Sequence, residues 1–342
     1  MRMSSESSVP ATMADRLRIQ VVSEASRVAE LAEDTRRGLG RRPKSVPAKY
    51  FYDERGAELF DLICNTEEYY PTRTEYALLQ SVSQQVLEIA RPRDIVELGS
   101  GAARKTRVLL DAVEQSGRRC RYIPFDVTLP MLKKSSLGLL QRYAWLQIHG
   151  IVGDYERHLA MLPTGSRRLF VFLGSTIGNY DVAATQSFLR GISCIMQDGD
   201  FLLLGTDTVK DRTVLHSAYN DASGVTAAFN KNLLSVLNRE LGAGFDLEDF
   251  AHEAFFNEKE QQIEMHLRAC REHTVSISSL GMEIQFERDE RLRTEISRKF
   301  TRSSVESMLG TGGLELLEWL PAPNDWFALS LAKKSRAQSF SD

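Results

Sequence analysis

The chain has few of the residues that build disulfide frameworks or metal centres. Its 342 residues include four cysteines, all standing singly, and six histidines, none in the paired spacing of a metal-binding helix. Disulfide-rich domains and structural zinc sites both need closely spaced ligands of these types. The sequence therefore predicts free thiols in a reducing cytoplasm and no metal site.

Long apolar runs and an excess of one charge sign are also missing. No run is long enough to cross a bilayer, and residues 1–10 are polar and serine-rich, unlike a signal segment. With 43 Lys and Arg against 46 Asp and Glu, the net charge is −3, which favours neither nucleic acid nor an anionic membrane as a partner. We therefore expect a cytoplasmic, monomeric protein that acts on a small molecule.

Strand and helix patterns alternate over residues 74–208. Continuous apolar runs such as 169–173 and 201–204 are typical of parallel strands that are covered on both faces. Consecutive right-handed βαβ units predict a doubly wound α/β fold. The expected strands are 94–98, 121–126, 145–152, 168–173 and 200–205, and the expected helices are 75–90, 105–115, 129–142 and 182–196.

The flanking segments follow other patterns. Residues 1–19 are predicted to be a disordered tail, and 20–73 to be the first part of a second domain. Residues 209–298 break the alternation and read as an α+β insertion, while 299–334 return to the first sheet. Helices are expected at 21–39, 57–64, 214–220, 225–241 and 305–309, and strands at 251–257, 262–270, 273–278, 314–320 and 326–332.

A glycine-rich turn, Glu97-x-Gly99-x-Gly101, lies between the first core strand and the next helix. Such a turn lets a ligand approach bare backbone near the positive end of a helix dipole. A pyrophosphate fingerprint would need a third glycine at position 104, where Arg104 stands. A carboxylate at Glu97 suits a cationic sulfonium, so the pattern favours S-adenosylmethionine, with an ordinary tight β–α turn as the alternative.

Acidic residues also follow the next two strands, as Asp126 and Asp154. Ligands of open α/β sheets bind outside the carboxyl ends of the strands. We expect Asp126 to accept from the ribose hydroxyls, and Asp154 with Tyr155 to contact the adenine. The alternative for each aspartate is a helix cap. Lys105 either pairs with the methionine carboxylate of the cofactor or is solvated.

Several motifs occur together and in order, from about Leu39 to Ala332. The most specific are Gly174-Ser-Thr-Ile-Gly-Asn179 and Gly224-Val-Thr-Ala-Ala-Phe-Asn230. The others are Tyr50-Phe-Tyr-Asp53, Glu68-Tyr-Tyr-Pro-Thr-Arg-Thr-Glu75, Glu97-Leu-Gly-Ser-Gly101, Phe125-Asp126, Leu204-Gly-Thr-Asp207, Ala218-Tyr219, Ile263-Glu-Met265 and Thr294-Glu-Ile-Ser-Arg-Lys-Phe300. Together these segments resemble one family, the L-histidine Nα-methyltransferases of ergothioneine biosynthesis.

The resemblance implies a class I methyltransferase fold, a Rossmann-like doubly wound sheet, with a second α+β substrate domain. It implies stepwise trimethylation of the α-amine of histidine to hercynine, with S-adenosylmethionine as the methyl donor. Asn179 and Tyr219 would bind the substrate carboxylate. Glu295 and Ser297, two apart on a strand and so on one face, would bind the imidazole.

The resemblance also places four residues around these anchors. Tyr69 would pack on the imidazole, Met265 would form a wall, and the Gly174 backbone would lie close to both ligands. Tyr52 would lie near the amine. No His or Lys is an obvious base, so the amine would lose its proton to water or with a weak assist from Tyr52.

Three other interpretations stay open on the residues alone. Glu295 and Ser297 could be a polar strand face. The chain could methylate another amino acid or amine, such as tryptophan, although an apolar residue at position 295 would then be expected. It could also bind S-adenosylmethionine without catalysis, but the substrate-site residues would then be dispensable.

Overall fold

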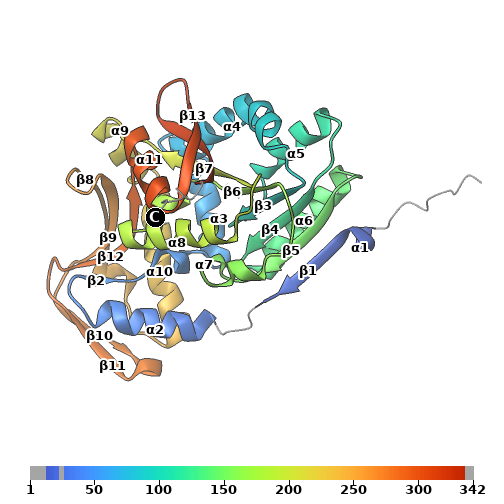
Figure 1. The fold of residues 1–342 in the computed structure, drawn as a ribbon. Coiled ribbons are helices and arrows are strands. Elements are labelled where there is room, and N and C mark those ends of the chain that lie inside the picture. The colour runs from blue at the N-terminus through green and yellow to red at the C-terminus, as the bar shows by residue number, and fades with distance from the viewer. Residues whose placement is uncertain (1–12, 23–26, 336–342) are drawn as a thin grey trace, which may run out of the picture.

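The computed structural model describes residues 13–22 and 27–335, and a sheet of eight strands forms its centre (Figure 1). In spatial order the strands are β1(Leu17–Val21), β5(Gln147–Val152), β4(Arg121–Asp126), β3(Asp94–Leu98), β6(Arg168–Phe172), β7(Phe201–Asp207), β14(Phe327–Lys334) and β13(Leu314–Pro321). The first six run parallel, whereas β14 pairs antiparallel with both β7 and β13. This confirms the predicted doubly wound sheet with an antiparallel hairpin at its end.

Helices cover both faces of this sheet. They are α4(Tyr70–Ala90), α5(Thr106–Gln115), α6(Leu129–Arg142), α8(Val182–Ile195) and α11(Arg302–Thr311). Successive strand residues enter opposite clusters: Ile95 packs with α4 and α5, and Val96 packs with α8 and α11. Burial on both sides explains why the runs 169–173 and 201–204, in β6 and β7, are continuously apolar in sequence.

The prediction of a disordered tail to residue 19 is wrong for residues 13–19. Residues 13–16 form the short helix α1(Met13–Arg16), and Leu17–Val21 forms β1, which pairs in parallel with β5. The Arg16 guanidinium donates to the carbonyl oxygens of Tyr143 and Leu140, at 2.9 and 3.1 Å. The missed signal was the apolar alternation of Leu17, Ile19 and Val21. Residues 1–12 lie outside the described residues.

A second sheet lies beside the first, on the left of Figure 1. Its spatial order is β2(Lys44–Ser45), β12(Arg291–Arg298), β9(Gln262–Ala269) and β8(Phe250–Asn257), with a separate hairpin of β10(His273–Ile277) and β11(Met282–Phe286). The helices here are α2(Arg27–Leu39), α3(Glu54–Ile63), α9(Arg212–Ala218) and α10(Val225–Leu241). The helix predicted from residue 21 begins at Arg27, because Val21 belongs to β1, and β11 was not predicted.

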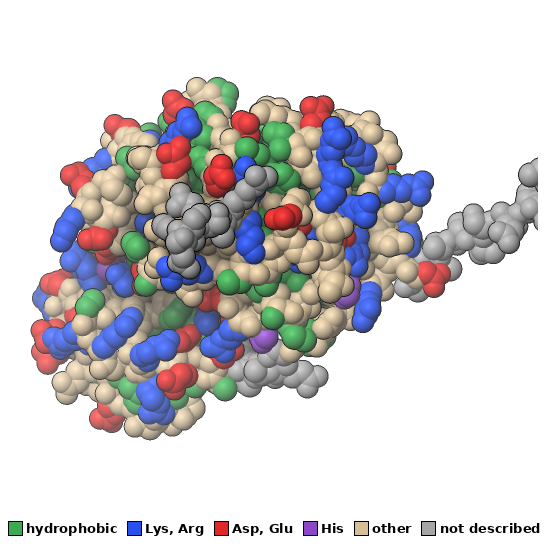
Figure 2. Space-filling view, viewed as in Figure 1, with side chains coloured by type: hydrophobic (Ala, Val, Ile, Leu, Met, Phe, Trp, Pro, Cys, Tyr) green, Lys and Arg blue, Asp and Glu red, His purple; other side chains and the backbone are tan. Residues whose placement is uncertain are grey.

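One apolar cluster joins the N-terminal segment to the insertion. Phe51 contacts Phe229 of α10, with ring centroids 4.5 Å apart, and both belong to a core that includes Leu267 of β9. Among the described residues, no helix is long and apolar enough to cross a membrane. On the face drawn in Figure 2, acidic and basic side chains alternate over the left half, and basic side chains gather at upper right.

Candidate functional site

The glycine turn after β3 adopts conformations that favour glycine. Gly99 and Gly101 have φ values of +73° and +48°. A Cβ on Gly99 would meet the Tyr155 ring at 3.7 Å, while nothing lies within 4 Å of one on Gly101. The Gly101 N–H donates to Asp126 Oδ2 at 2.9 Å. The structure therefore brings Gly99, Gly101, Asp126 and Tyr155 together around a turn whose outer side is open.

The two strand-end aspartates differ in their hydrogen-bond partners. Asp126 is half-buried and accepts from the Gly101 and Thr128 N–H groups, and burial raises its pKa above the ordinary value despite those bonds. Asp154 caps α7(Tyr155–His158) by accepting from the Glu156 N–H at 2.8 Å. The capping alternative thus holds for Asp154, and its contact with adenine stays a prediction.

Glu97 is held inside the sheet. It is 5% exposed, and its Oε2 accepts from the hydroxyls of Thr106 and Tyr122. Burial raises its pKa to about 7, although the two hydroxyls oppose the shift. Glu97 therefore joins β3 to β4 and to the start of α5.

Lys105 is partly exposed, and its contact with the methionine carboxylate of the cofactor stays a prediction. Its ammonium pairs with Glu75, a wholly buried carboxylate of α4. Glu75 also accepts from the Gly174 N–H at 2.8 and 2.9 Å, so it ties the start of α5 to the turn after β6. Sequence reasoning assigned no role to Glu75, although a carboxylate on the apolar face of α4 was the available signal.

The segment that carries Asn179 lies against β12. Asn179 ends a single 3₁₀ turn, Thr176–Asn179, and a Cβ on Gly178 would meet the Arg298 carbonyl oxygen at 2.9 Å. This close approach needs glycine and brings Asn179 to the strand that carries Ser297. Among the described residues, none hydrogen-bonds the Asn179 amide, which is half-buried.

Three side chains follow one another on one face of β12 and its extension: Glu295, Ser297 and Lys299. The Tyr219 hydroxyl donates to Ser297 Oγ at 2.8 Å. The Lys299 ammonium donates to Tyr219 Oη at 3.0 Å and to Ser297 Oγ at 2.9 Å. The two predicted anchors, for carboxylate and for imidazole, are therefore in direct contact through Ser297.

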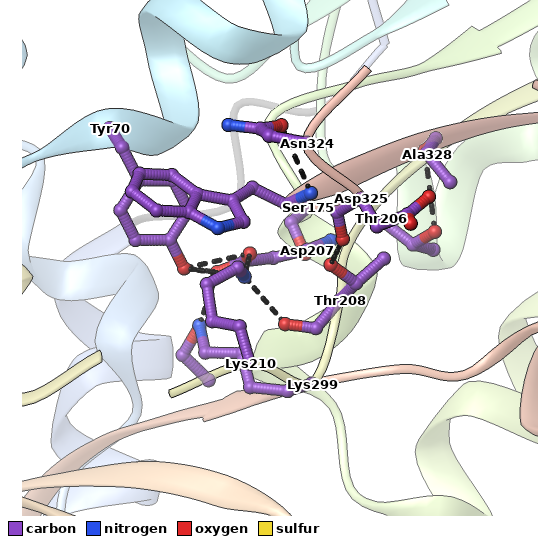
Figure 3. A network of polar contacts seen from close by, with 12 residues as sticks. Tyr70, Ser175, Thr206, Asp207, Thr208, Lys210, Lys299, Asn324, Asp325 and Ala328 are labelled. Atoms are coloured by element: carbon purple, nitrogen blue, oxygen red, sulfur yellow. Dashed lines mark hydrogen bonds and ion pairs between the residues drawn. The ribbon is translucent and has the colours of Figure 1, made fainter. Parts of the chain in front are cut away.

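A buried ion cluster stands behind these hydroxyls, as Figure 3 shows. Asp207, at the end of β7, pairs with Lys299 at 2.7 Å and with Lys210, and it accepts from Tyr70 at 2.8 Å. Burial opposes the charge on Asp207 and Lys299, but their mutual attraction outweighs it: the pKa of Asp207 is lowered and that of Lys299 is raised. Burial lowers the pKa of Lys210 to about 8.

Glu295 is the least satisfied charged group of the site. Within the described ranges no side chain hydrogen-bonds its carboxylate, and burial raises its pKa to about 7, with Lys299 opposing. Met265, 2% exposed, is its register partner on β9. A half-buried carboxylate without a partner is unfavourable unless a ligand supplies a donor.

Aromatic rings complete the surroundings. The Tyr69 ring lies 6.2 Å from the Tyr219 ring, and the Tyr52 ring lies 5.7 Å from Phe229. Burial, and then neighbouring groups that include Glu295, raise the pKa values of Tyr52 and Tyr69 well above the ordinary value. Both therefore stay phenols at neutral pH, and the place of Tyr52 near the amine stays a prediction.

Tyr219 is also held through its backbone. His252 Nε2 lies 2.9 Å from the Tyr219 carbonyl oxygen, and its Nδ1 lies 2.9 Å from the Asn230 amide nitrogen. Asn230 accepts from the Thr294 hydroxyl at 2.7 Å. This relay links the strand of Glu295 to the position of Tyr219. Sequence reasoning missed this chain of hydrogen bonds and the ion cluster of Asp207, Lys210 and Lys299 that lies next to the site.

Comparison with known proteins gives a consistent set of relatives. A model of the family described as histidine-specific, SAM-dependent methyltransferases matches residues 31–334. A histidine N-alpha-methyltransferase of Mycobacterium tuberculosis is 45% identical over 304 residues, 89% of this chain and 95% of that protein. One of Mycolicibacterium smegmatis is 46% identical, with 88% and 94% covered. Ergothioneine biosynthesis protein 1 of Schizosaccharomyces pombe is 31% identical, with 80% of this chain and 36% of that protein covered.

Proposed function

Because the chain belongs to the family of histidine-specific, S-adenosylmethionine-dependent methyltransferases, we propose that it methylates the α-amine of L-histidine. Three successive transfers would give hercynine, and this reaction would be the first step of ergothioneine biosynthesis. The observation that carries the proposal is Glu295: a half-buried, unpartnered carboxylate and the nearby hydroxyl of Ser297 offer both polarities that an imidazole needs. The names of the relatives support the same reaction.

The turn after β3 suits S-adenosylmethionine, which supplies an electrophilic methyl group when bound. The open side of Gly101 accommodates a ligand against the backbone, and Asp126 lies directly behind it. We assign cofactor contacts to Gly99, Gly101, Asp126 and Tyr155. We place Lys105 near the methionine end as a cation already paired with Glu75.

The residues of the substrate end would fix histidine at two points. Asn179 and Tyr219 would hold its carboxylate, while Glu295 and Ser297 would hold its imidazole between Tyr69 and Met265. Displacement at a methyl group needs an aligned, neutral amine and little else. Since Tyr52 and Tyr69 remain phenols, we assign proton loss to water, with Tyr52 as a hydrogen-bond partner and an aromatic face for the growing cation.

Mass spectrometry tests this function directly. The purified chain is incubated with S-adenosylmethionine and each amino acid in turn, with histamine as a further substrate. We expect mono-, di- and trimethylated products from histidine, and very little from histamine, which lacks the carboxylate. Equal methylation of histamine would show that Asn179 and Tyr219 are misassigned. Preferred turnover of another amine would favour the related N-methyltransferase, and no turnover a non-catalytic binding protein.

We further propose a monomeric, cytoplasmic enzyme in which residues 209–298 and the segment predicted as 20–73, without its ends in β1 and α4, form the substrate domain. The four cysteines are free, and the shared apolar cluster of the two segments supports this division. Light scattering after gel filtration gives the oligomeric state, and a stable dimer would contradict it.

A further inference from the structure

We propose that Lys299 is a positioning residue that fixes Ser297 and Tyr219 as hydrogen-bond donors toward the substrate, so that the site selects a ring carrying an acceptor nitrogen. The inference rests on the proposed function, because it concerns how the same site reads the side chain of its substrate. Lys299 itself would touch no substrate atom, since its ammonium is fully enclosed.

The contacts of the Lys299 ammonium use all of its donors. Its side chain is 0% exposed, and it lies 2.7 Å from Asp207 Oδ2, 2.9 Å from Ser297 Oγ and 3.0 Å from Tyr219 Oη. An ammonium has three N–H donors and no acceptor. Every one of these contacts therefore runs outward from Lys299, and both hydroxyl oxygens must accept.

This direction determines where the hydroxyl hydrogens go. Tyr219 donates to Ser297 Oγ at 2.8 Å, so that oxygen accepts from both Tyr219 and Lys299. A hydroxyl has two acceptor positions and one hydrogen. With both positions filled, Ser297 can only donate elsewhere. If Tyr219 turns its hydrogen to a substrate carboxylate, Lys299 still fills one of the two acceptor positions of Ser297 Oγ and leaves the Ser297 hydrogen available to a ring nitrogen.

Ser297 and Glu295 then present opposite polarities on one face of β12. Glu295 accepts, and Ser297, 4% exposed, donates. A neutral imidazole matches both, with its N–H toward Glu295 and its bare nitrogen toward Ser297. A ring without that nitrogen leaves a buried hydroxyl hydrogen unpaired, which is costly.

The other partners of Asp207 should allow Lys299 to be replaced without unfolding the protein. Asp207 keeps Lys210 and the Tyr70 hydroxyl as partners when the Lys299 ammonium is removed. Lys210 is also the matched control, because it pairs with Asp207 but donates its hydrogen bonds to Tyr70, Asp207 and Thr208, not to Ser297 or Tyr219.

The experiment measures selectivity between histidine and β-(2-thienyl)alanine, which keeps the carboxylate, amine and ring size but has no ring nitrogen. Calorimetry with S-adenosylhomocysteine present gives both dissociation constants for the wild type, Lys299→Met and Lys210→Met. We expect Lys299→Met to reduce the histidine preference by roughly 10- to 100-fold, the range for hydrogen bonds that involve a charged group. Lys210→Met should keep the wild-type ratio, and the S-adenosylhomocysteine affinity should stay within about twofold in all three.

Ser297→Ala supplies a second route if Lys299→Met does not fold, because it removes the donor itself and should lower the same ratio. Adding Lys299→Met to Ser297→Ala should then lower it little further. A wild-type ratio in Lys299→Met, or an equal fall in Lys210→Met, would overturn the inference. Because binding is measured apart from turnover, a wild type that binds selectively without methylating would refute the proposed function and leave the inference standing.

Discussion

The cofactor end of the site is built mainly from backbone, whereas the substrate end is built from buried side chains. At the first end, Asp126 is satisfied by two N–H groups of neighbouring turns. At the second, Lys299 and Asp207 are side chains from different segments that satisfy each other. A site built from backbone depends on local conformation, whereas a cluster of side chains depends on tertiary packing. Substitutions at the two ends should therefore differ in their effects on binding and activity.

The largest effect is expected where one substrate-end side chain has no substitute. Glu295→Ala should lose most kcat/KM for histidine and tolerate phenylalanine and tryptophan better, because sites built to hydrogen-bond a substrate can discriminate by roughly 10⁴–10⁵-fold. Competitive turnover of the three amino acids measures this, with the exposed Glu272→Ala as control. An unchanged histidine preference would move specificity to Tyr69 and Ser297.

A smaller effect is expected at the cofactor end. Asp126→Ala should weaken S-adenosylhomocysteine binding by roughly 1.5–3 kcal/mol, the scale of charge-assisted hydrogen bonds. The Gly101 N–H also loses its acceptor, so part of the loss reflects the turn. Calorimetric titration gives the value, and the exposed Asp198→Ala serves as control. Equal affinities in wild type and Asp126→Ala would remove Asp126 from the cofactor site.

The substrate end should also differ from the cofactor end in its pH dependence. Burial raises the pKa of Glu295 to about 7, with Lys299 opposing, so the carboxylate proposed to accept the imidazole N–H is lost as pH falls below that value. The ratio of kcat/KM for wild type to that for Glu295→Gln should fall by about tenfold per pH unit below 7, because protonation follows one group.

Titration of the substrate amine and imidazole is common to both proteins and cancels in the ratio. Ser297→Ala, which keeps Glu295, should retain the acid limb of the wild type. A ratio that stays constant between pH 7 and pH 5.5 would mean that Glu295 remains ionised throughout or does not face the imidazole.

The same contrast explains what sequence could predict. The turn at Gly99 and Gly101 and the carboxylate of Asp126 follow successive strands, so a regular α/β pattern places them at one sheet edge, and the bounds of β3, β4, α6 and α10 were predicted correctly. The ion cluster of Lys299, Lys210 and Asp207 was not predicted, because no local sequence pattern indicates that the end of β7 contacts the end of β12. Only the family resemblance brought Tyr219 and Glu295 into one site.

The smallest effect is expected behind Tyr219, where the substrate end is supported by backbone as the cofactor end is. His252→Ala removes the donor to the Tyr219 carbonyl oxygen and the acceptor of the Asn230 amide. We expect a loss of about 1 kcal/mol in the free energy of unfolding at pH 7.5, and only a few-fold rise in KM for histidine. The exposed His216→Ala should change neither.

The direction in which pH changes this stability follows from the pKa of His252. Burial lowers that pKa below its ordinary value, while the Tyr219 carbonyl opposes the shift. A neutral folded-state histidine contributes stability above its unfolded pKa of about 6.5 and loses it as pH falls toward the folded value. Between pH 7.5 and pH 5.5, the free energy of unfolding measured with denaturant should therefore fall less for His252→Ala than for wild type. Part of the drop remains in the variant, because burial also lowers the pKa values of His149 and His266. Identical drops in both proteins would show that the His252 relay adds no pH-dependent stability.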